Sequence, residues 1–220
     1  IILNFINIYK YMGANVPINS NQLSVPRYPI IATENRFIYP QPLCLSLREK
    51  VFSWSGDDFS ITDLYGTPFF KCGGRAFSMR QKKVLYDIYM KPLYNIKHEL
   101  LSLRGRYKFN YGEGGERVFA SVDPLSTFKS LYSVSFFNLA TGQNDYLELA
   151  CDFLGSKCGI FHGSAKQGAP LICRINKQYD SKNFFYNKQN YVVEIAPNVD
   201  AAFMIGLGMI FDEIKNDDDD

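Results

Sequence analysis

Short runs of alternating apolar and polar residues recur along the chain between residues 43 and 195. Residues 59–62 alternate in this way, and residues 117–122 resume the alternation after a glycine-rich turn. A period of two places every second side chain on the same face, which is typical of a half-buried strand. Roughly ten or more such runs are separated by turn residues, at a spacing that predicts a barrel or a sandwich.

A seven-residue motif accompanies two of the turns. The sequence DLYGTPF at 63–69 returns as DIYMKPL at 87–93, and GAPL at 168–171 repeats its second half. In such a motif Asp accepts a hydrogen bond from a nearby backbone N–H, Gly permits a positive φ, and Pro fixes φ where the return strand starts. The repeat therefore favours a series of hairpins. Met90 replaces Gly66, so its turn is expected either to differ in type or to hold strain.

The segment from 199 to 214 breaks the strand pattern and predicts one helix, with Asp200 as its N-cap or first-turn acid. Apolar residues cover every face from 201 to 211. A helix of this kind must be buried in protein or lipid. It is too short for lipid, because a spanning helix needs about 20 apolar residues. Close approach to surrounding strands would explain Gly206 and Gly208. The predicted core residues of this helix are Ala201, Phe203, Met204, Ile205, Leu207, Ile210 and Phe211.

These patterns together predict a mainly β fold, an antiparallel barrel of about twelve strands that encloses the hydrophobic C-terminal helix. The alternative is a helix that packs across the end of a β-sandwich. We expect residues 1–40 to form an irregular segment rich in Pro and Asn, residues 41–215 the barrel domain, and residues 216–220 a solvated acidic tail. The chain starts without Met, and we interpret its first residues as an upstream stretch or a fragment edge, with Met12 as a candidate start.

Three longer stretches carry a family resemblance: FSWSGDDFSITDLYGTPFF, VLYDIYMKPLYNIKHELLSLRGRYKFNYGEG and the terminal YVVEIAPNVDAAFMIGLGMIFDEI. In these stretches the chain resembles the LURP-one-related family, over residues 41 to 215. The resemblance implies the fold that this family shares with the tubby C-terminal domain and the phospholipid scramblases, a twelve-stranded barrel around a central C-terminal helix. It implies no catalytic residues. Plant members are associated with defence responses, and tubby domains bind phosphoinositides through basic residues.

Basic residues are concentrated between 71 and 108, where ten Lys and Arg stand against two acidic residues. This segment carries a charge of +8 in a chain whose net charge is +2. Consecutive hairpins are usually neighbours in space, so much of this charge is expected on one wall of the barrel. There it would attract anionic headgroups, and the alternative is an ordinary solvated strand surface. The candidate headgroup residues are Lys71, Arg75, Arg80, Lys82, Lys83, Lys97, Arg104, Arg106 and Lys108.

Signals for catalysis or metal binding are weak. With two His residues and no Cys-x-x-Cys pair, the sequence predicts no metal site and no cofactor. Cys158 and His162 are four residues apart, which on a regular strand places both on one face, but no third group that would orient the base is recognisable. Ser126 and Lys129 fit a Ser-x-x-Lys pattern without its companion motifs. We therefore predict that the chain is not an enzyme, with a cysteine or serine hydrolase as the alternative.

The sequence and the resemblance predict a tubby-like binding module that recognises anionic phospholipids, including phosphoinositides, at membrane surfaces. A protein-interaction or regulatory scaffold without lipid binding, related to defence or stress, is the alternative, and its protein partners are unknown. The odd number of Cys residues and the absence of an Asn-x-Ser/Thr site favour an intracellular protein, in the cytoplasm with peripheral membrane association or in the nucleus. No transmembrane segment is predicted, and no nucleic-acid-binding motif is present.

Overall fold

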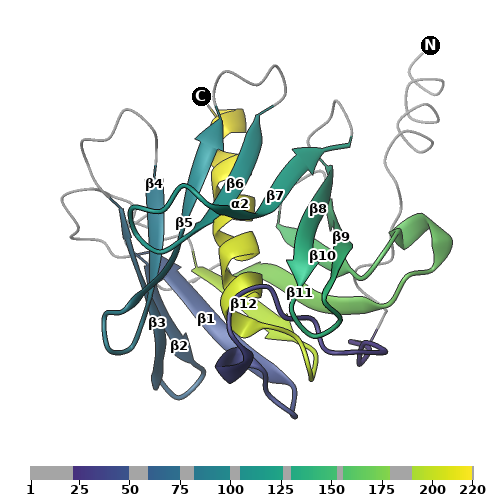
Figure 1. Cartoon of the computed structure of the whole chain (residues 1–220), viewed down its shortest axis with the longest axis horizontal. Helices are drawn as coiled ribbons and strands as arrows, with labels where there is room; N and C mark the ends of the chain where they lie inside the picture. Colours follow the sequence, from purple (N-terminus) through teal and green to yellow (C-terminus); the bar gives the residue numbers. More distant parts are fainter. Residues whose placement is uncertain are drawn as a thin grey trace.

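The computed structural model describes residues 22–49, 59–74, 82–99, 105–125, 130–152, 156–178 and 190–219. Within them the chain forms a closed barrel of twelve antiparallel strands, which confirms the predicted fold (Figure 1). Each strand pairs with the one before it, and β1 pairs with β12 to close the barrel. The strands are β1 (Leu43–Glu49), β2 (Phe59–Asp63), β3 (Pro68–Gly74), β4 (Lys82–Asp87), β5 (Pro92–Glu99), β6 (Arg106–Tyr111), β7 (Val118–Pro124), β8 (Leu131–Asn138), β9 (Gln143–Cys151), β10 (Lys157–Phe161), β11 (Leu171–Gln178) and β12 (Asn190–Ile195).

The helix α2 (Ala201–Asp219) runs through the barrel (Figure 1). Every residue from 201 to 214 is buried, including all of the predicted core residues. The ring of Phe203, for example, lies 5.3 Å from the rings of both Phe109 and Phe136, centroid to centroid. The strands surround the helix on all sides, so it needs no polar face. The backbone stays helical to Asp219, so most of the predicted acidic tail continues the helix.

Residues 22–42, which precede β1, pack against the start of the helix. They are irregular apart from the 3-10 turn η1 (Asn35–Phe37). Ile30 forms a parallel bridge with Val199, next to the first helical residue, and is fully buried. Ile30, Ala32 and Phe37 of this segment therefore pack into the core of the barrel. Met12 lies outside the described residues.

Asp200 joins the irregular segment to the helix. Its Oδ2 accepts hydrogen bonds from the backbone N–H of Ala32 (3.1 Å) and of Thr33 (2.8 Å), and from the Thr33 hydroxyl (2.7 Å). Its Oδ1 accepts a hydrogen bond from the Phe203 N–H at 3.1 Å, which confirms the predicted N-cap. Burial raises the pKa of the Asp200 carboxyl to about 6, although these four donors favour the charged form.

The two copies of the repeat form the same turn. In each copy Oδ1 of the first residue, Asp63 or Asp87, accepts hydrogen bonds from the backbone N–H groups two and four residues later. Gly66 adopts a φ of 88° and Met90 a φ of 63°, so both lie in the left-handed region. Of the two alternatives for Met90, strain within the same type of turn is therefore correct.

Neither α2 nor any other helix in the described part of the chain has the length and apolarity needed to cross a bilayer.

Candidate functional site

The outer wall formed by β3–β6 carries the basic segment of the sequence. Lys97 of β5 lies opposite Lys108 of β6, and the backbone of Lys82 in β4 lies opposite Lys97, so one cross-strand row contains three lysine positions. Ile96 faces the core, and alternation along the strand therefore turns Lys97 outward. Lys71 of β3 is also exposed on this wall. The structure thus brings several of the candidate headgroup residues together.

Acidic residues on the same wall compensate part of this charge. Nζ of Lys108 lies 2.5 Å from the Glu99 carboxylate, and Arg106 pairs with Asp123. For Lys71 and Lys97, no carboxylate of the described residues lies within ion-pair distance. Ion pairs at an exposed surface contribute about 0–1 kcal/mol. An anionic ligand can therefore compete for the paired cations as well.

Lys83 does not belong to this outer surface, contrary to its place in the predicted set. It lies opposite Ile96 and points into the barrel, with 4% of its surface exposed. Its Nζ lies 3.2 Å from Oε1 of Glu213 and 3.8 Å from Oδ2 of Asp212, both on α2. The ammonium group is therefore buried against carboxylates of α2 and is not accessible to a headgroup.

Several predicted residues cannot be placed on either side of the wall. The backbone of Lys82 is described, but its side chain is not. The remaining ones, Arg75, Arg80 and Arg104 of the basic set together with Ser126 and Lys129 of the hydrolase alternative, lie outside the described residues.

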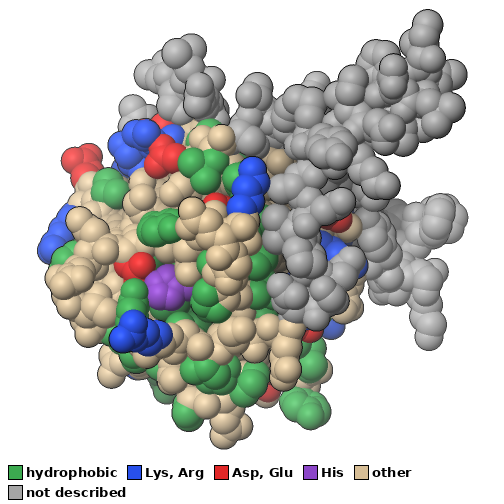
Figure 2. Space-filling view, turned by 90° about the vertical axis from the view of Figure 1, so that its right-hand side faces the viewer, with side chains coloured by type: hydrophobic (Ala, Val, Ile, Leu, Met, Phe, Trp, Pro, Cys, Tyr) green, Lys and Arg blue, Asp and Glu red, His purple; other side chains and the backbone are tan. Residues whose placement is uncertain are grey.

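The side of the barrel at the right of Figure 1 is different. Where it is described, Figure 2 shows hydrophobic and uncharged polar atoms, with basic side chains only in separate places. A polar cluster that the sequence did not reveal lies here: Nε2 of His162 is 3.1 Å from both carboxylate oxygens of Asp145 and 3.4 Å from the Tyr28 hydroxyl. These three residues share no sequence motif, so only the fold brings them together.

The thiol of Cys158 and the imidazole of His162 do not form a catalytic pair. Cys158 is fully buried on the inner face of β10, and its Sγ lies 2.7 Å from Sγ of Cys151. His162 follows the last residue of β10, and its imidazole contacts the Asp145 carboxylate and the Tyr28 hydroxyl instead of the Cys158 thiol. Burial raises the pKa of the Cys158 thiol well above its usual value, whereas a nucleophile needs a lowered one. In the described part of the chain, His, Cys, Asp and Glu side chains form no cluster suited to a metal ion.

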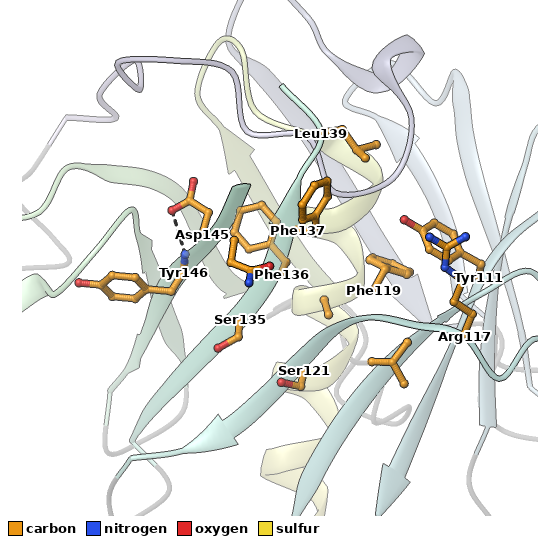
Figure 3. Close-up of a pocket in the computed structure, with 13 residues that line it drawn as sticks. Tyr111, Arg117, Phe119, Ser121, Ser135, Phe136, Phe137, Leu139, Asp145 and Tyr146 are labelled. Atoms are coloured by element: carbon orange, nitrogen blue, oxygen red, sulfur yellow. Dashed lines mark hydrogen bonds between the residues drawn. The ribbon is translucent and has the colours of Figure 1, made fainter. Parts of the chain in front are cut away.

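A groove of about 670 Å³ lies on the outer surface where β7 and β8 separate (Figure 3). Tyr111 and Arg117 form one bank, Asp145 and Tyr146 form the other, and Phe119 lies between them. The sequence gives no sign of this groove, because its lining comes from four strands and the loops beside them.

The fold and the wall define a class of protein: a closed antiparallel barrel that encloses its C-terminal helix and carries a lysine-rich outer wall. The family model of the LURP-one-related proteins matches residues 43–212. The chain therefore belongs to the LURP-one-related family, which confirms the resemblance seen in the sequence.

Named relatives and a solved structure agree with this assignment. Protein LURP-one-related 10 of Arabidopsis thaliana is 25% identical over 192 residues, which cover 83% of this chain and 95% of that protein. Protein LURP-one-related 15 of the same plant is 23% identical over 222 residues, which cover 96% of each. An X-ray structure of an Arabidopsis thaliana protein matches with a TM-score of 0.60 at 20% identity, over 84% of this chain and 98% of that one, and supports the fold alone. The names of these relatives describe family membership and no reaction.

Proposed function

We propose that this protein is a non-enzymatic, tubby-like binding module whose outer β3–β6 wall recognises anionic phospholipid headgroups, phosphoinositides included, at an intracellular membrane surface. The observation that carries the proposal is the cross-strand row of Lys82, Lys97 and Lys108, with Lys71 on the same wall. Adjacent strands lie about 4.8 Å apart. Lysines on neighbouring strands can therefore contact one phosphate group or neighbouring ones.

Electrostatic attraction of this kind has a characteristic magnitude and salt dependence. Each basic residue near an anionic membrane surface contributes about 1 kcal/mol. Lys71 and Lys97, which pair with no carboxylate in the described ranges, and Lys108, whose ion pair is partly exposed, therefore favour reversible binding. The Debye length is about 10 Å at 0.1 M salt and shorter at higher salt, so the attraction should weaken strongly as salt is added.

Co-sedimentation with lipid vesicles tests the proposal. Phosphatidylcholine vesicles are compared with vesicles that also contain phosphatidylserine or a phosphatidylinositol bisphosphate, at about 0.1 M and 0.5 M salt. We expect binding to the anionic vesicles at low salt and release at high salt. The double variant Lys71→Glu with Lys97→Glu should bind at least about tenfold more weakly, because it removes two attractive charges and adds two repulsive ones.

The matched control is Arg27→Glu with Lys166→Glu. Both residues are exposed and lie away from β3–β6, so this variant changes the net charge by the same amount without changing the wall. It should bind nearly as well as the wild type. The proposal fails if the wild type ignores anionic vesicles at low salt, or if the two double variants lose binding equally.

A protein-interaction scaffold without lipid binding is the second candidate. It is favoured by large apolar side chains exposed on the turns β2–β3 and β4–β5, where Leu64 is 63%, Tyr65 96% and Tyr89 82% exposed. Strand β3 pairs with β4, so both turns lie at the same end of the barrel (Figure 1). Exposed apolar residues gathered in this way mark interaction surfaces. A scaffold of this kind would not sediment with any of the vesicles.

A further inference from the structure

The groove between β7 and β8 has a defined structural origin. The register of β6 against β7 shifts so that Phe109 lies opposite Ala120 but Asn110 lies opposite Val118, which leaves Phe119 as the extra residue of a β-bulge. A bulge bends its strand and increases the local twist. Pairing of β7 with β8 ends at Ala120 and Phe136, although β8 continues to Asn138. The two strands therefore part, and the wall opens outward.

Apolar side chains line this opening and remain partly exposed. Val118, Phe137, Leu139 and Tyr146 are 44–48% exposed, and all four line the groove. In Figure 3, Phe137 and Leu139 lie above Phe119, between the two banks. A volume of about 670 Å³ is within the range of small-molecule sites. The groove can therefore remove a small apolar group from water.

The charges at the two banks are not equivalent. The guanidinium carbon of Arg117 lies 5.4 Å from the centroid of the Tyr111 ring, and no carboxylate of the described residues pairs with it. On the other bank Asp145 is already engaged: besides His162, it accepts hydrogen bonds from the Tyr146 N–H at 2.8 Å and from Nδ2 of Asn138 at 3.1 Å. The groove therefore has one cation available for a ligand, and its carboxylate is satisfied within the protein.

We propose that this groove binds a small amphipathic carboxylate, with its apolar body against Phe119, Phe137 and Leu139 and its carboxylate on Arg117. Charge complementarity selects an anion, because a guanidinium group forms strong, charge-assisted hydrogen bonds with carboxylates. The aromatic bank and floor select an apolar body. The lining of this site shares only strand β6 with the headgroup surface of β3–β6, and it contains none of the candidate headgroup residues.

Calorimetric titration with three probes tests the ligand class. Decanoate combines a carboxylate with a ten-carbon apolar chain. Hexanoate has the same carboxylate with four fewer methylene groups, and decyltrimethylammonium has a ten-carbon chain with a positive charge. Decanoate should bind saturably below its micellar concentration, and hexanoate at least about tenfold more weakly, because each buried methylene contributes up to about a fourfold change in affinity. Decyltrimethylammonium should not bind saturably.

Two variants test the carboxylate contact and the alkyl-chain contacts of the ligand separately. Arg117→Gln should weaken decanoate binding about tenfold or more while keeping the ratio between decanoate and hexanoate. Phe137→Ser should reduce that ratio, and Leu139→Ser gives a second test of the chain contacts if the first variant folds poorly. Arg48→Gln on β1 and Leu64→Ser on the β2–β3 turn are exposed controls that should bind like the wild type.

The proposal is overturned if wild-type protein shows no saturable binding of decanoate, if the cationic probe binds equally well, or if Arg117→Gln binds like the wild type. None of these results depends on vesicles or on Lys71 and Lys97. Failure here therefore leaves the headgroup proposal untouched, and the vesicle assay can fail without affecting this one.

Discussion

The two glycines of the central helix lie in different surroundings, and replacing each with alanine should have opposite effects. A Cβ atom at Gly206 would lie 2.5 Å from Cε1 of Phe109 and closer still to the hydroxyl of Tyr94. At Gly208 the nearest atom, Cδ2 of Leu47, would be 3.6 Å away, which is an ordinary van der Waals contact. The sequence predicted close approach at both positions, and the structure shows tight packing at Gly206 alone of the two.

The magnitudes follow from these contacts. In Gly206→Ala the Tyr94 side chain must move, and its hydroxyl donates a hydrogen bond of 2.6 Å to the Ala202 carbonyl inside the core. Overpacking destabilises the protein by about 1–3 kcal/mol, and disturbing the buried hydrogen bond destabilises it by about 1–3 kcal/mol more. The higher helix propensity of alanine stabilises it by about 1 kcal/mol. We expect a net loss of about 1–5 kcal/mol. Gly208→Ala keeps the propensity gain without the overlap, so it should stabilise the protein by about 0.5–1 kcal/mol.

Urea unfolding and thermal melts, both followed by circular dichroism, measure the two effects. In a protein of this size 1 kcal/mol corresponds to about 2–4 °C. The melting temperature should therefore fall by about 2–20 °C in Gly206→Ala and rise by about 1–4 °C in Gly208→Ala. Adding Tyr94→Phe to Gly206→Ala removes the hydroxyl that overlaps most and should recover part of the loss. Equal effects at the two glycines, or a neutral Gly206→Ala, would refute this account of the packing.

Two further predictions concern Asp200 and the strained turn. Burial raises the pKa of Asp200 in the folded protein to about 6, above about 3.9 in the unfolded chain, so its stabilising contribution is full below the lower value and is lost as pH rises through about 6. From pH 7 to pH 4 the free energy of unfolding should thus rise by about 2 kcal/mol relative to Asp200→Asn, and equal pH profiles in urea titrations would contradict this. Met90→Gly should raise the free energy of unfolding by about 1 kcal/mol, because Met90 has a φ of 63°. Gly66→Ala, at a φ of 88°, should lower the free energy of unfolding by a similar amount. If urea titrations show both changes to be neutral, the turn is not strained at these positions.

The architecture of this protein could be predicted from its sequence, because strands, turns and the helix leave local signals. Alternation with period two marks the strands, and the Asp63 and Asp87 motifs mark two hairpin turns whose hydrogen bonds lie within five residues. A helix that is apolar on every face has to be surrounded by protein, so the C-terminal segment favoured an enclosing barrel over a helix packed across the end of a sandwich. The lysine-rich stretch was equally visible, because charge can be counted along the chain.

Which of those charges reach the surface, and where a ligand can bind, depends on how the strands pack in three dimensions. Lys82 and Lys83 are adjacent and chemically alike, and the pairing of β4 with β5 turns Lys83 toward α2. Residues 167 positions apart meet when Thr33 donates to Asp200, which no local pattern encodes. The groove depends on a bulge at Phe119, a property of the register between two strands. Register and long-range contacts are set by the packing of the whole barrel, and for that reason the site could not be predicted as the fold was.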